Sequence, residues 1–167
     1  MVTQPFVQCV RPARTGDAEF ILELCERLPA NFAVPPWRTP AEVVSADQAA
    51  VAAAIALPQD DQAVLVAEGP DGPAGFAYLV TLVDYFSRRP HAHLSILAVS
   101  AAAEGRGVGR ALLQAAEDWA RARGHDAITL HVFVANERAR ALYERVGYAA
   151  ETIRYVKPLP AEPDAPA

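Results

Sequence analysis

The chain has 167 residues, of which 52% are hydrophobic and 21% are charged; this composition is typical of a globular domain and excludes a disordered chain. Fifteen basic and twenty acidic residues give a formal net charge of -5, without the basic footprint of a protein that binds nucleic acid or an anionic membrane. We therefore predict one domain over residues 1–157, with neither of these partners, and a proline-rich, disordered tail over residues 158–167.

A strand, a helix, a proline-rich loop and a second helix are expected in the first third of the chain. The strand covers residues 6–10, and Asp17 is placed to cap a helix that ends near residue 28. Four prolines within residues 29–40 forbid a regular helix there. This segment is predicted as a shaped loop, and an alanine-rich helix follows over residues 41–57.

Four strands and one helix are expected in the middle of the chain. Two strands, residues 63–68 and 75–83, are joined by strong turn chemistry and predict a hairpin. A fourth strand covers residues 91–99 and a fifth covers 126–134, each with alternating side chains. Between them, residues 109–123 repeat apolar side chains at helical spacing.

The last elements are a capped helix and a strand. Asn136 is placed to cap the helix, which Gly147 closes. Residues 150–156 are predicted as the terminal strand.

The N-terminus and the two cysteines favour a cytoplasmic protein. Residues 1–10 contain no basic cluster followed by an apolar block, so no secretory signal is expected. Cys9 and Cys25 form no CxxC pair and have no histidine at metal-ligand spacing, which predicts reduced thiols and no metal site. The most apolar stretch, residues 49–57, is about half as long as a membrane-spanning helix.

A glycine-rich turn stands between the fourth strand and the amphipathic helix. Gly105, Gly107 and Gly109 alternate there, and glycine lets a ligand approach the backbone closely. A helix N-terminus offers unpaired N–H donors and the positive end of the helix dipole, which together suit a phosphate. Arg106 and Arg110 add positive charge. The turn predicts a pyrophosphate site, and a tight turn that only packs strand against helix is the alternative.

The glycine spacing excludes two common nucleotide motifs and resembles a third. Arg110 stands where GxGxxG needs its last glycine, and no lysine followed by Ser or Thr forms a P-loop. In contrast, residues 104–109, Glu-Gly-Arg-Gly-Val-Gly, resemble the coenzyme A motif Q/R-x-x-G-x-G/A of the GNAT superfamily of N-acetyltransferases. Residues 130–136 and 141–148 resemble its second signature, L-x-V-x-x-x-N-x-x-A-x-x-L-Y-E-x-x-G-F/Y. The departure is Glu104, where Gln or Arg is usual, and we expect it to turn outward.

The resemblance implies a fold, an activity and a cosubstrate. The fold is of the α/β (α+β) class, with a mixed, mostly antiparallel sheet of about six to seven strands, splayed central strands and about four flanking helices. The activity is transfer of an acetyl group from acetyl-CoA, without a metal, to an amine of a small molecule or a peptide. Family likeness also makes a homodimer a candidate assembly.

The resemblance places the coenzyme in the gap between the fourth and fifth strands. Backbone groups near Leu97 and Val99 then pair with the pantetheine amides like an added strand, and the N–H groups of residues 106–110 hold the pyrophosphate. Asn136 and Tyr143 lie seven residues apart on one helix, on one face and roughly 10 Å apart. The implied coenzyme-binding residues are Leu97, Ala98, Val99, Glu104, Gly105, Arg106, Gly107, Val108, Gly109, Arg110, Asn136, Ala139 and Tyr143.

Tyr143 is the predicted general acid and the general base is open. A Tyr hydroxyl can protonate the thiolate that leaves when an amine attacks a thioester, while a backbone N–H near Leu97 or Ala98 stabilises the oxyanion. A half-buried packing residue is the alternative for Tyr143. Between Asp84 and Glu104 the chain has no Asp or Glu to serve as the base.

His93 is the candidate base, acting through a water held by Ser95, and Asp84 is its competitor. Strand parity predicts that His91, His93 and Ser95 share a face with Leu97 and Val99. A structural role is the alternative for His93.

Aromatic side chains and an acid mark the predicted acceptor site. The resemblance places the acceptor between the first two helices and the end of the third strand, where the candidate residues are Phe32, Trp37, Asp84 and Tyr85. Ring faces and a carboxylate suit a cationic amine, although Phe32 and Trp37 can equally pack the proline loop. Two other functions stay open: a non-catalytic coenzyme A-binding module, and an acyltransferase that uses another acyl-CoA or another acceptor.

Overall fold

One sheet of five strands forms the centre of the protein, which a computed structural model describes for residues 5–159. The strands are β1 (Cys9–Pro12), β2 (Gln62–Gly69), β3 (Gly72–Val83), β4 (Pro90–Val99) and β5 (Ile128–Leu130). They lie side by side in chain order, and neighbours from β1 to β4 are antiparallel. β5 runs parallel to β4 and forms the edge of the sheet.

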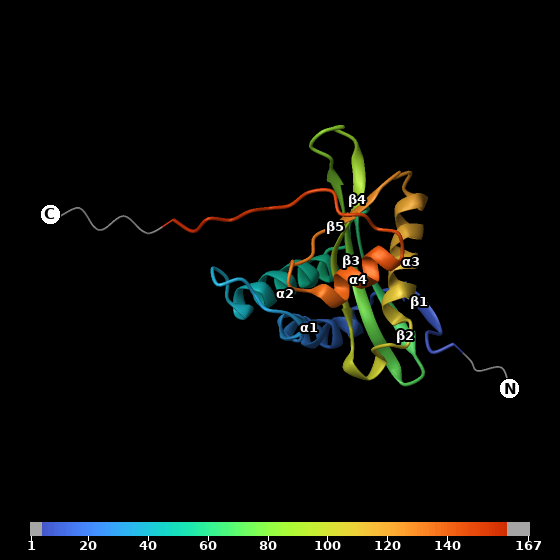
Figure 1. Cartoon of the computed structure of the whole chain (residues 1–167). Helices are drawn as coiled ribbons and strands as arrows, with labels where there is room; N and C mark the ends of the chain where they lie inside the picture. The colour runs from blue at the N-terminus through green and yellow to red at the C-terminus, as the bar shows by residue number, and fades with distance from the viewer. Residues whose placement is uncertain (1–4, 160–167) are drawn as a thin grey trace.

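Helices cover both faces of the sheet. They are α1 (Ala18–Glu26), α2 (Pro40–Ala56), α3 (Val108–Ala122) and α4 (Glu137–Arg145), with short 3-10 turns at Thr15–Asp17, Leu28–Asn31 and Ala101–Ala103. Figure 1 shows α1 and α2 on one side of the sheet and α3 on the other. We call these sides the α1/α2 face and the α3 face. Within residues 5–159, no helix is both long enough and apolar enough to cross a bilayer.

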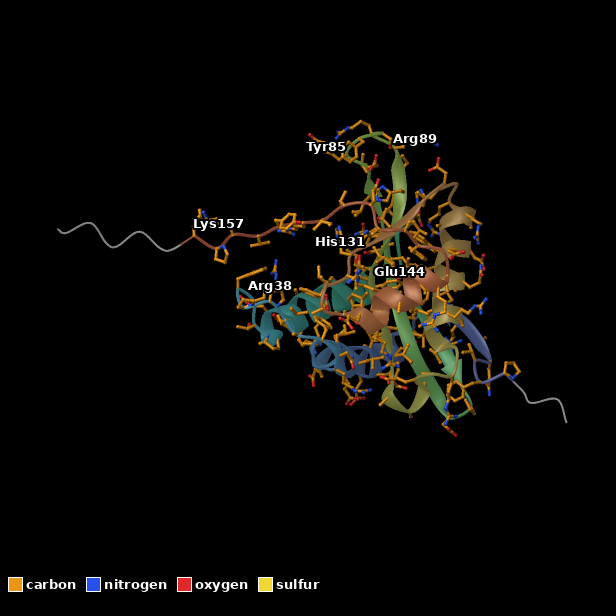
Figure 2. The ribbon with its side chains drawn as sticks, viewed as in Figure 1. Arg38, Tyr85, Arg89, His131, Glu144 and Lys157 are labelled. Atoms are coloured by element: carbon orange, nitrogen blue, oxygen red, sulfur yellow. The ribbon has the colours of Figure 1, made fainter. Side chains whose placement is uncertain are left out.

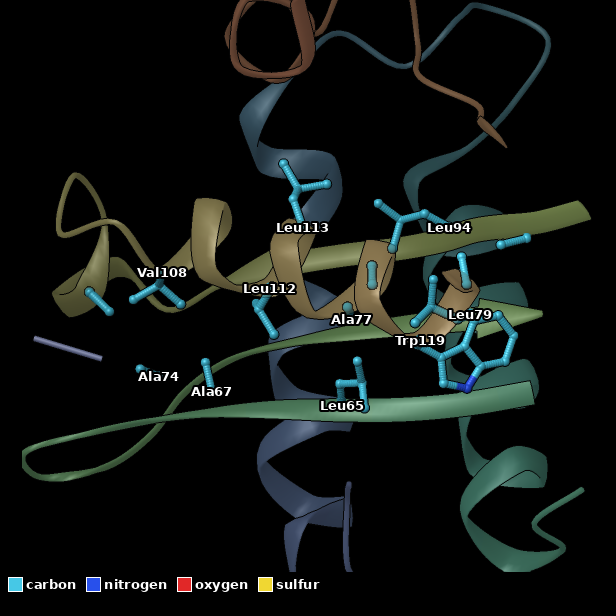
Figure 3. Close-up of a cluster of buried hydrophobic side chains, with 14 residues drawn as sticks. Leu65, Ala67, Ala74, Ala77, Leu79, Leu94, Val108, Leu112, Leu113 and Trp119 are labelled. Carbon is cyan, nitrogen blue, oxygen red and sulfur yellow. The ribbon is translucent and has the colours of Figure 1, made fainter. Parts of the chain in front are cut away.

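Each face of the sheet has its own buried apolar cluster. The α3 face buries, among others, Leu65, Leu79, Leu94, Leu112, Leu113 and Trp119 (Figure 3). The α1/α2 face buries, among others, Ile21, Cys25, Val51, Val66, Phe76 and Ile96. At Gly75 the chain segments approach so closely that a Cβ would lie 2.6 Å from the carbonyl oxygen of Ala98, so only glycine fits there.

The first two helices begin in different ways. α2 begins at Pro40, one residue before its predicted start, and a capping box fixes this start: Glu42 N donates to Thr39 Oγ1 at 3.2 Å, and Thr39 N donates to Glu42 Oε2 at 2.6 Å. The prediction that the Asp17 side chain caps α1 is wrong. Its carboxylate instead accepts from Arg11 Nη1 at 2.7 Å and from Arg14 N at 2.6 Å, which ties the start of α1 to β1.

The predicted α/β (α+β) class, the mostly antiparallel sheet and the four helices are confirmed. The predicted six to seven strands are wrong, because the described sheet has five. Residues 150–156 are exposed and unpaired; the chain after α4 runs away from the sheet (Figure 1), and the three-residue β5 offers only a short edge for pairing. The predicted tail lies outside the described residues from residue 160 onward.

Candidate active site

β4 and β5 diverge after a short parallel ladder. The paired residues are Ala92 with Ile128, His93 with Thr129, and Leu94 with Leu130. β4 then continues to Val99 with β3 on its other side, but residues 95–99 have no β5 partner within the described chain. We call residues 95–99 the open edge of β4. This divergence is the predicted splaying of the central strands, and an unpaired strand edge offers main-chain hydrogen bonds to an extended ligand.

A β-bulge in β4 stands where the two strands diverge. Across the β3–β4 ladder, Tyr78 pairs with Ile96 but the next residue, Leu79, pairs with Leu94. Ser95 is therefore an extra residue without a partner on β3. The bulge reverses the alternation of side chains, because Leu94 belongs to the cluster on the α3 face and Ile96 to the cluster on the α1/α2 face.

The bulge corrects the predicted arrangement of the candidate base. His93 pairs with Val80, which packs against the cluster on the α1/α2 face. Leu97 and Val99 pack against the cluster on the α3 face. The prediction that His93 shares a face with Leu97 and Val99 is therefore wrong, since parity counting assumes a strand without a bulge. The Ser95 side chain itself is exposed.

The glycine-rich turn leads from the open edge to an uncapped helix N-terminus. Gly105 and Gly107 have φ values of 73° and 84°, in the left-handed region that glycine adopts without strain. No described side chain caps α3 at Gly107. The first hydrogen bond onto this turn comes from Ala111 N to Gly107 O at 3.0 Å, so the preceding N–H groups of α3 have no partner within residues 5–159 and are free to bind an anion.

The charged side chains of this turn are engaged in different ways. Arg106 lies over the Phe6 ring, 4.8 Å from the ring centroid, while Arg110 is exposed. Glu104 forms an ion pair with Arg138 of α4, with Nη1 2.7 Å from Oε2. Glu104 thus links the glycine turn to α4, and its negative charge is balanced by Arg138.

Tyr143 lies on α4 and Asn136 directly precedes this helix, which packs beside the start of α3. A Cβ at Gly109 would lie only 3.3 Å from the Leu142 side chain. Asn136 caps α4 as predicted, because its Oδ1 accepts from Ala139 N at 3.2 Å. Tyr143 is half-buried, and burial raises the pKa of its hydroxyl to about 12.

Three histidines and a threonine gather where β4 and β5 diverge. Thr129 Oγ1 lies 2.8 Å from His93 Nδ1 and 3.1 Å from His91 Nε2. His93 is 8% exposed, and its ring centroid is 4.9 Å from that of His131. Burial, together with the nearby His131 and His91, lowers the pKa of His93 to about 4.

His131 was not among the site residues that the sequence predicted. It is exposed and directly follows the last paired residue of β5, and Figure 2 labels it near the centre of the view. The sequence signal that points to His131 is its position two residues after Thr129, because residues at this spacing lie on one face of a strand. Within residues 5–159, no group of three His, Cys, Asp or Glu side chains could hold a metal ion.

The predicted acceptor residues occupy separate places. Phe32 stacks on Phe133, with ring centroids 4.8 Å apart, so the loop between α1 and α2 contacts the segment that follows His131. Trp37 is 44% exposed. Asp84 belongs to the tip of the β3–β4 hairpin, where its Oδ1 accepts from Ser87 N at 2.6 Å.

Tyr85 packs edge-on against Phe86 at the same tip, well separated from His131 in Figure 2. The four predicted acceptor residues therefore do not form one described cluster.

Comparison with known proteins identifies similar sequences over the same region. Residues 24–148 match the model of the Acetyltransferase (GNAT) family. The chain is 53% identical over 53 residues to mycothiol acetyltransferase of Beutenbergia cavernae, a match that covers 32% of this chain but only 18% of that protein. It is 32% identical over 108 residues to the uncharacterized N-acetyltransferase YhfO of Bacillus subtilis, covering 64% of this chain and 72% of that protein.

A solved structure has a similar fold along nearly its whole length. A putative acetyl transferase from Pyrococcus furiosus superposes with a TM-score of 0.72 at 24% identity. The match covers 90% of this chain and 99% of that chain. At this identity the likeness shows a shared fold.

Proposed function

Because the chain belongs to the acetyltransferase (GNAT) family, we propose that it is an N-acetyltransferase that moves an acetyl group from acetyl-CoA to a primary amine of a small molecule or a peptide. One observation carries this proposal: the open edge of β4 leads directly to the unpaired N-terminus of α3. A strand edge suits the amides of a pantetheine arm, and a helix N-terminus suits a diphosphate. These are two neighbouring parts of one coenzyme.

The coenzyme contacts follow from this arrangement. The N–H groups of residues 107–110 bind the diphosphate, since the Arg106 N–H already donates to Ala103 O at 3.3 Å. The backbone of Leu97, Ala98 and Val99 binds the arm. Val108 is buried, so it contributes its N–H while its side chain anchors the turn. Asn136 and Ala139, at the start of α4, contact the arm from that helix.

Tyr143 is proposed as the general acid. Attack of the amine nitrogen on the thioester carbon forms the N–C bond, and the C–S bond then breaks to release a thiolate. Tyr143 donates its hydroxyl proton to this sulfur. Because burial raises the pKa of Tyr143 to about 12, the hydroxyl keeps its proton over the whole neutral range. A backbone N–H of the open edge, near Leu97 or Ala98, stabilises the oxyanion.

The acceptor is proposed to reach the thioester from the α1/α2 face. The stacked Phe32 and Phe133 connect the α1–α2 loop to the chain that follows β5. The open edge and the glycine turn would bind the coenzyme in the same way whichever amine reacts. The kind of amine is therefore decided on the α1/α2 face.

The test is release of free thiol from acetyl-CoA across a panel of amines that includes peptides, polyamines, aminoglycosides and amino-acid analogues. We expect turnover with at least one amine, and calorimetry should show binding of coenzyme A. Coenzyme A binding without turnover on any amine would favour a non-catalytic binding module. Faster turnover with a longer acyl-CoA would replace acetyl as the transferred group, and no affinity for coenzyme A would contradict the proposal altogether.

A further inference from the structure

The histidine cluster lies on the side of the sheet from which the acceptor is proposed to enter. His93 faces the α1/α2 side because of the bulge at Ser95. Thr129 is the β5 partner of His93 and hydrogen-bonds to it. His131 lies two residues beyond Thr129, and its ring contacts that of His93. The exposed imidazole of His131 thus stands on the α1/α2 face at the start of the open edge.

The hydroxyl of Thr129 holds the His91 and His93 imidazoles. A hydroxyl has one proton to donate and two lone pairs, and Thr129 Oγ1 lies 2.8 Å from His93 Nδ1, 3.1 Å from His91 Nε2 and 3.5 Å from the carbonyl oxygen of Ala92. At least one of the two imidazoles therefore donates to Thr129. The His91 Nδ1 atom is buried and has no partner within the described residues.

The rings of His93 and His131 are in contact. Protonation of both at once is therefore unfavourable in free energy. Two positive rings with centroids 4.9 Å apart repel each other. His93 is 8% exposed and would lose hydration on becoming charged, whereas His131 is exposed. A proton on His93 is therefore disfavoured, because burial and then the neighbouring His131 lower the pKa of His93. Within the described residues, His91 also lowers the pKa of His93. The pKa of Asp84 is lowered by the hydrogen bond from Ser87 N and, to a lesser degree, by His91.

We propose that His131 is the general base for the acceptor amine, and that His93 and Thr129 are positioning residues that hold its ring at the divergence of β4 and β5. This inference rests on the proposed acetyl transfer. The amine nitrogen forms a bond to the carbonyl carbon and gives one proton to His131, while the C–S bond breaks and the sulfur takes the proton of Tyr143. Solvent then carries one proton from His131 to Tyr143, which restores both groups.

The absence of an acid on β4 fits this assignment. Between Asp84 and Glu104 the chain has no Asp or Glu, and Asp84 is held in the hairpin turn by its hydrogen bond from Ser87. His93, the base expected from the sequence, is buried and its pKa of about 4 makes it a weak proton acceptor at neutral pH. His131 offers an exposed imidazole one strand away.

The experiment compares His131→Gln with His93→Gln, Thr129→Val and the control His125→Gln. His125 hydrogen-bonds to Thr81 Oγ1 at 3.1 Å and lies at the turn between α3 and β5, outside the site. For His131→Gln we expect kcat/KM to fall about a hundredfold, as for loss of a general base, with the affinity for coenzyme A unchanged. The rate should then follow the ionisation of the amine itself. His125→Gln should behave as wild type.

The positioning role of His93 and Thr129 needs a measurement that a loss of stability alone would not change. Thr129→Val should shift the acid limb of the pH profile of kcat/KM as well as lower its height, whereas a change in stability alone would lower only the height. In parallel, nitrogen-15 NMR of the four histidines should show that His131 takes up its proton before His93 as the pH falls, with signals assigned by the single variants.

Two results would overturn this inference while leaving the proposed function intact: wild-type kcat/KM for His131→Gln at every pH, or protonation of His93 before His131. Loss of coenzyme A binding and of turnover in the wild-type protein would be a different outcome, since it contradicts the proposed function itself.

Discussion

The two sides of the candidate site are built in different ways. The coenzyme side consists of neighbours in the sequence: the end of β4, the glycine turn and α3 follow one another, and only α4 joins from further along the chain. The acceptor side brings together the α1–α2 loop, β4 and the end of β5, which are separated by long stretches of sequence. The first side relies on backbone groups and the second on side chains.

The two sides can therefore tolerate different substitutions. Backbone N–H groups and a strand edge depend on conformation, so many side chains can change without altering what they bind. On the acceptor side, imidazole and aromatic side chains would themselves contact the amine. Each substitution there therefore changes the groups that contact the acceptor. Variants of the coenzyme side should therefore change affinity for coenzyme A, while variants of the acceptor side should change the kinetics of the amine.

The largest effect is expected at Tyr143, where both sides meet. Tyr143→Phe should lower kcat by about 10²- to 10⁴-fold, because it removes the proton donor to the thiolate, with little change in affinity for coenzyme A. The matched control is Tyr148→Phe. The Tyr148 hydroxyl is buried without a hydrogen-bond partner in the described chain, so its removal should leave kcat unchanged. Equal kcat in wild type and Tyr143→Phe would exclude the general-acid role.

The glycine turn provides the next largest effect and a test of backbone binding. Gly107→Ala places a Cβ at a left-handed residue, φ 84°, and should cost about 1 kcal/mol of folding free energy. Distortion of one N–H donor should weaken coenzyme A binding roughly tenfold, the effect of losing one hydrogen bond to a charged group.

Gly124→Ala is the control for Gly107→Ala, because Gly124 is also left-handed, φ 72°, but ends α3 at its other end. Thermal denaturation should show a similar loss of stability in both variants, while calorimetry should show weaker coenzyme A binding only for Gly107→Ala. Equal affinities for coenzyme A would place the diphosphate elsewhere.

How far the sequence predicts the site follows the same division. The glycine turn, the start of α3 and the Asn136 cap are short-range patterns, and each was predicted close to where it lies. The bulge at Ser95 could not be predicted from the sequence. β4 buries apolar side chains on both of its faces, so the sequence pattern does not show where the alternation of faces reverses. His131 was missed because its contact with His93 forms only when β4 and β5 pair.

The C-terminal segment shows the limit of strand patterns. Thr152, Ile153, Arg154 and Tyr155 alternate polar and apolar side chains as an edge strand does. The pattern indicates that the segment can form a strand, but a strand also needs a partner. In the described chain residues 150–156 have none, so a correct local pattern gave a wrong element.

A smaller effect is expected on the acceptor side at Phe32. Phe32→Ala removes the ring stacked on Phe133 and should raise KM for the amine by about two- to tenfold, the range expected for one aromatic pair, without changing coenzyme A affinity. Phe86→Ala is the control, since Phe86 packs against Tyr85 at the hairpin tip. A rise in KM for Phe86→Ala, with none for Phe32→Ala, would move the acceptor site to that tip.

The smallest effect concerns the one side chain on the coenzyme side that departs from the family motif. Glu104→Gln removes a negative charge near the proposed diphosphate and should tighten coenzyme A binding roughly twofold, the size of one charge acting over about 10 Å through water. Arg138→Gln leaves Glu104 without its partner and should weaken coenzyme A binding by a similar factor.

Both changes in coenzyme A affinity should become smaller in high salt, because these side chains are solvent-exposed or partly so. Calorimetry at two salt concentrations measures the coenzyme A affinity of both variants. If the affinity changed in the same direction in both, the ion pair would act by joining the glycine turn to α4 and not through its charges.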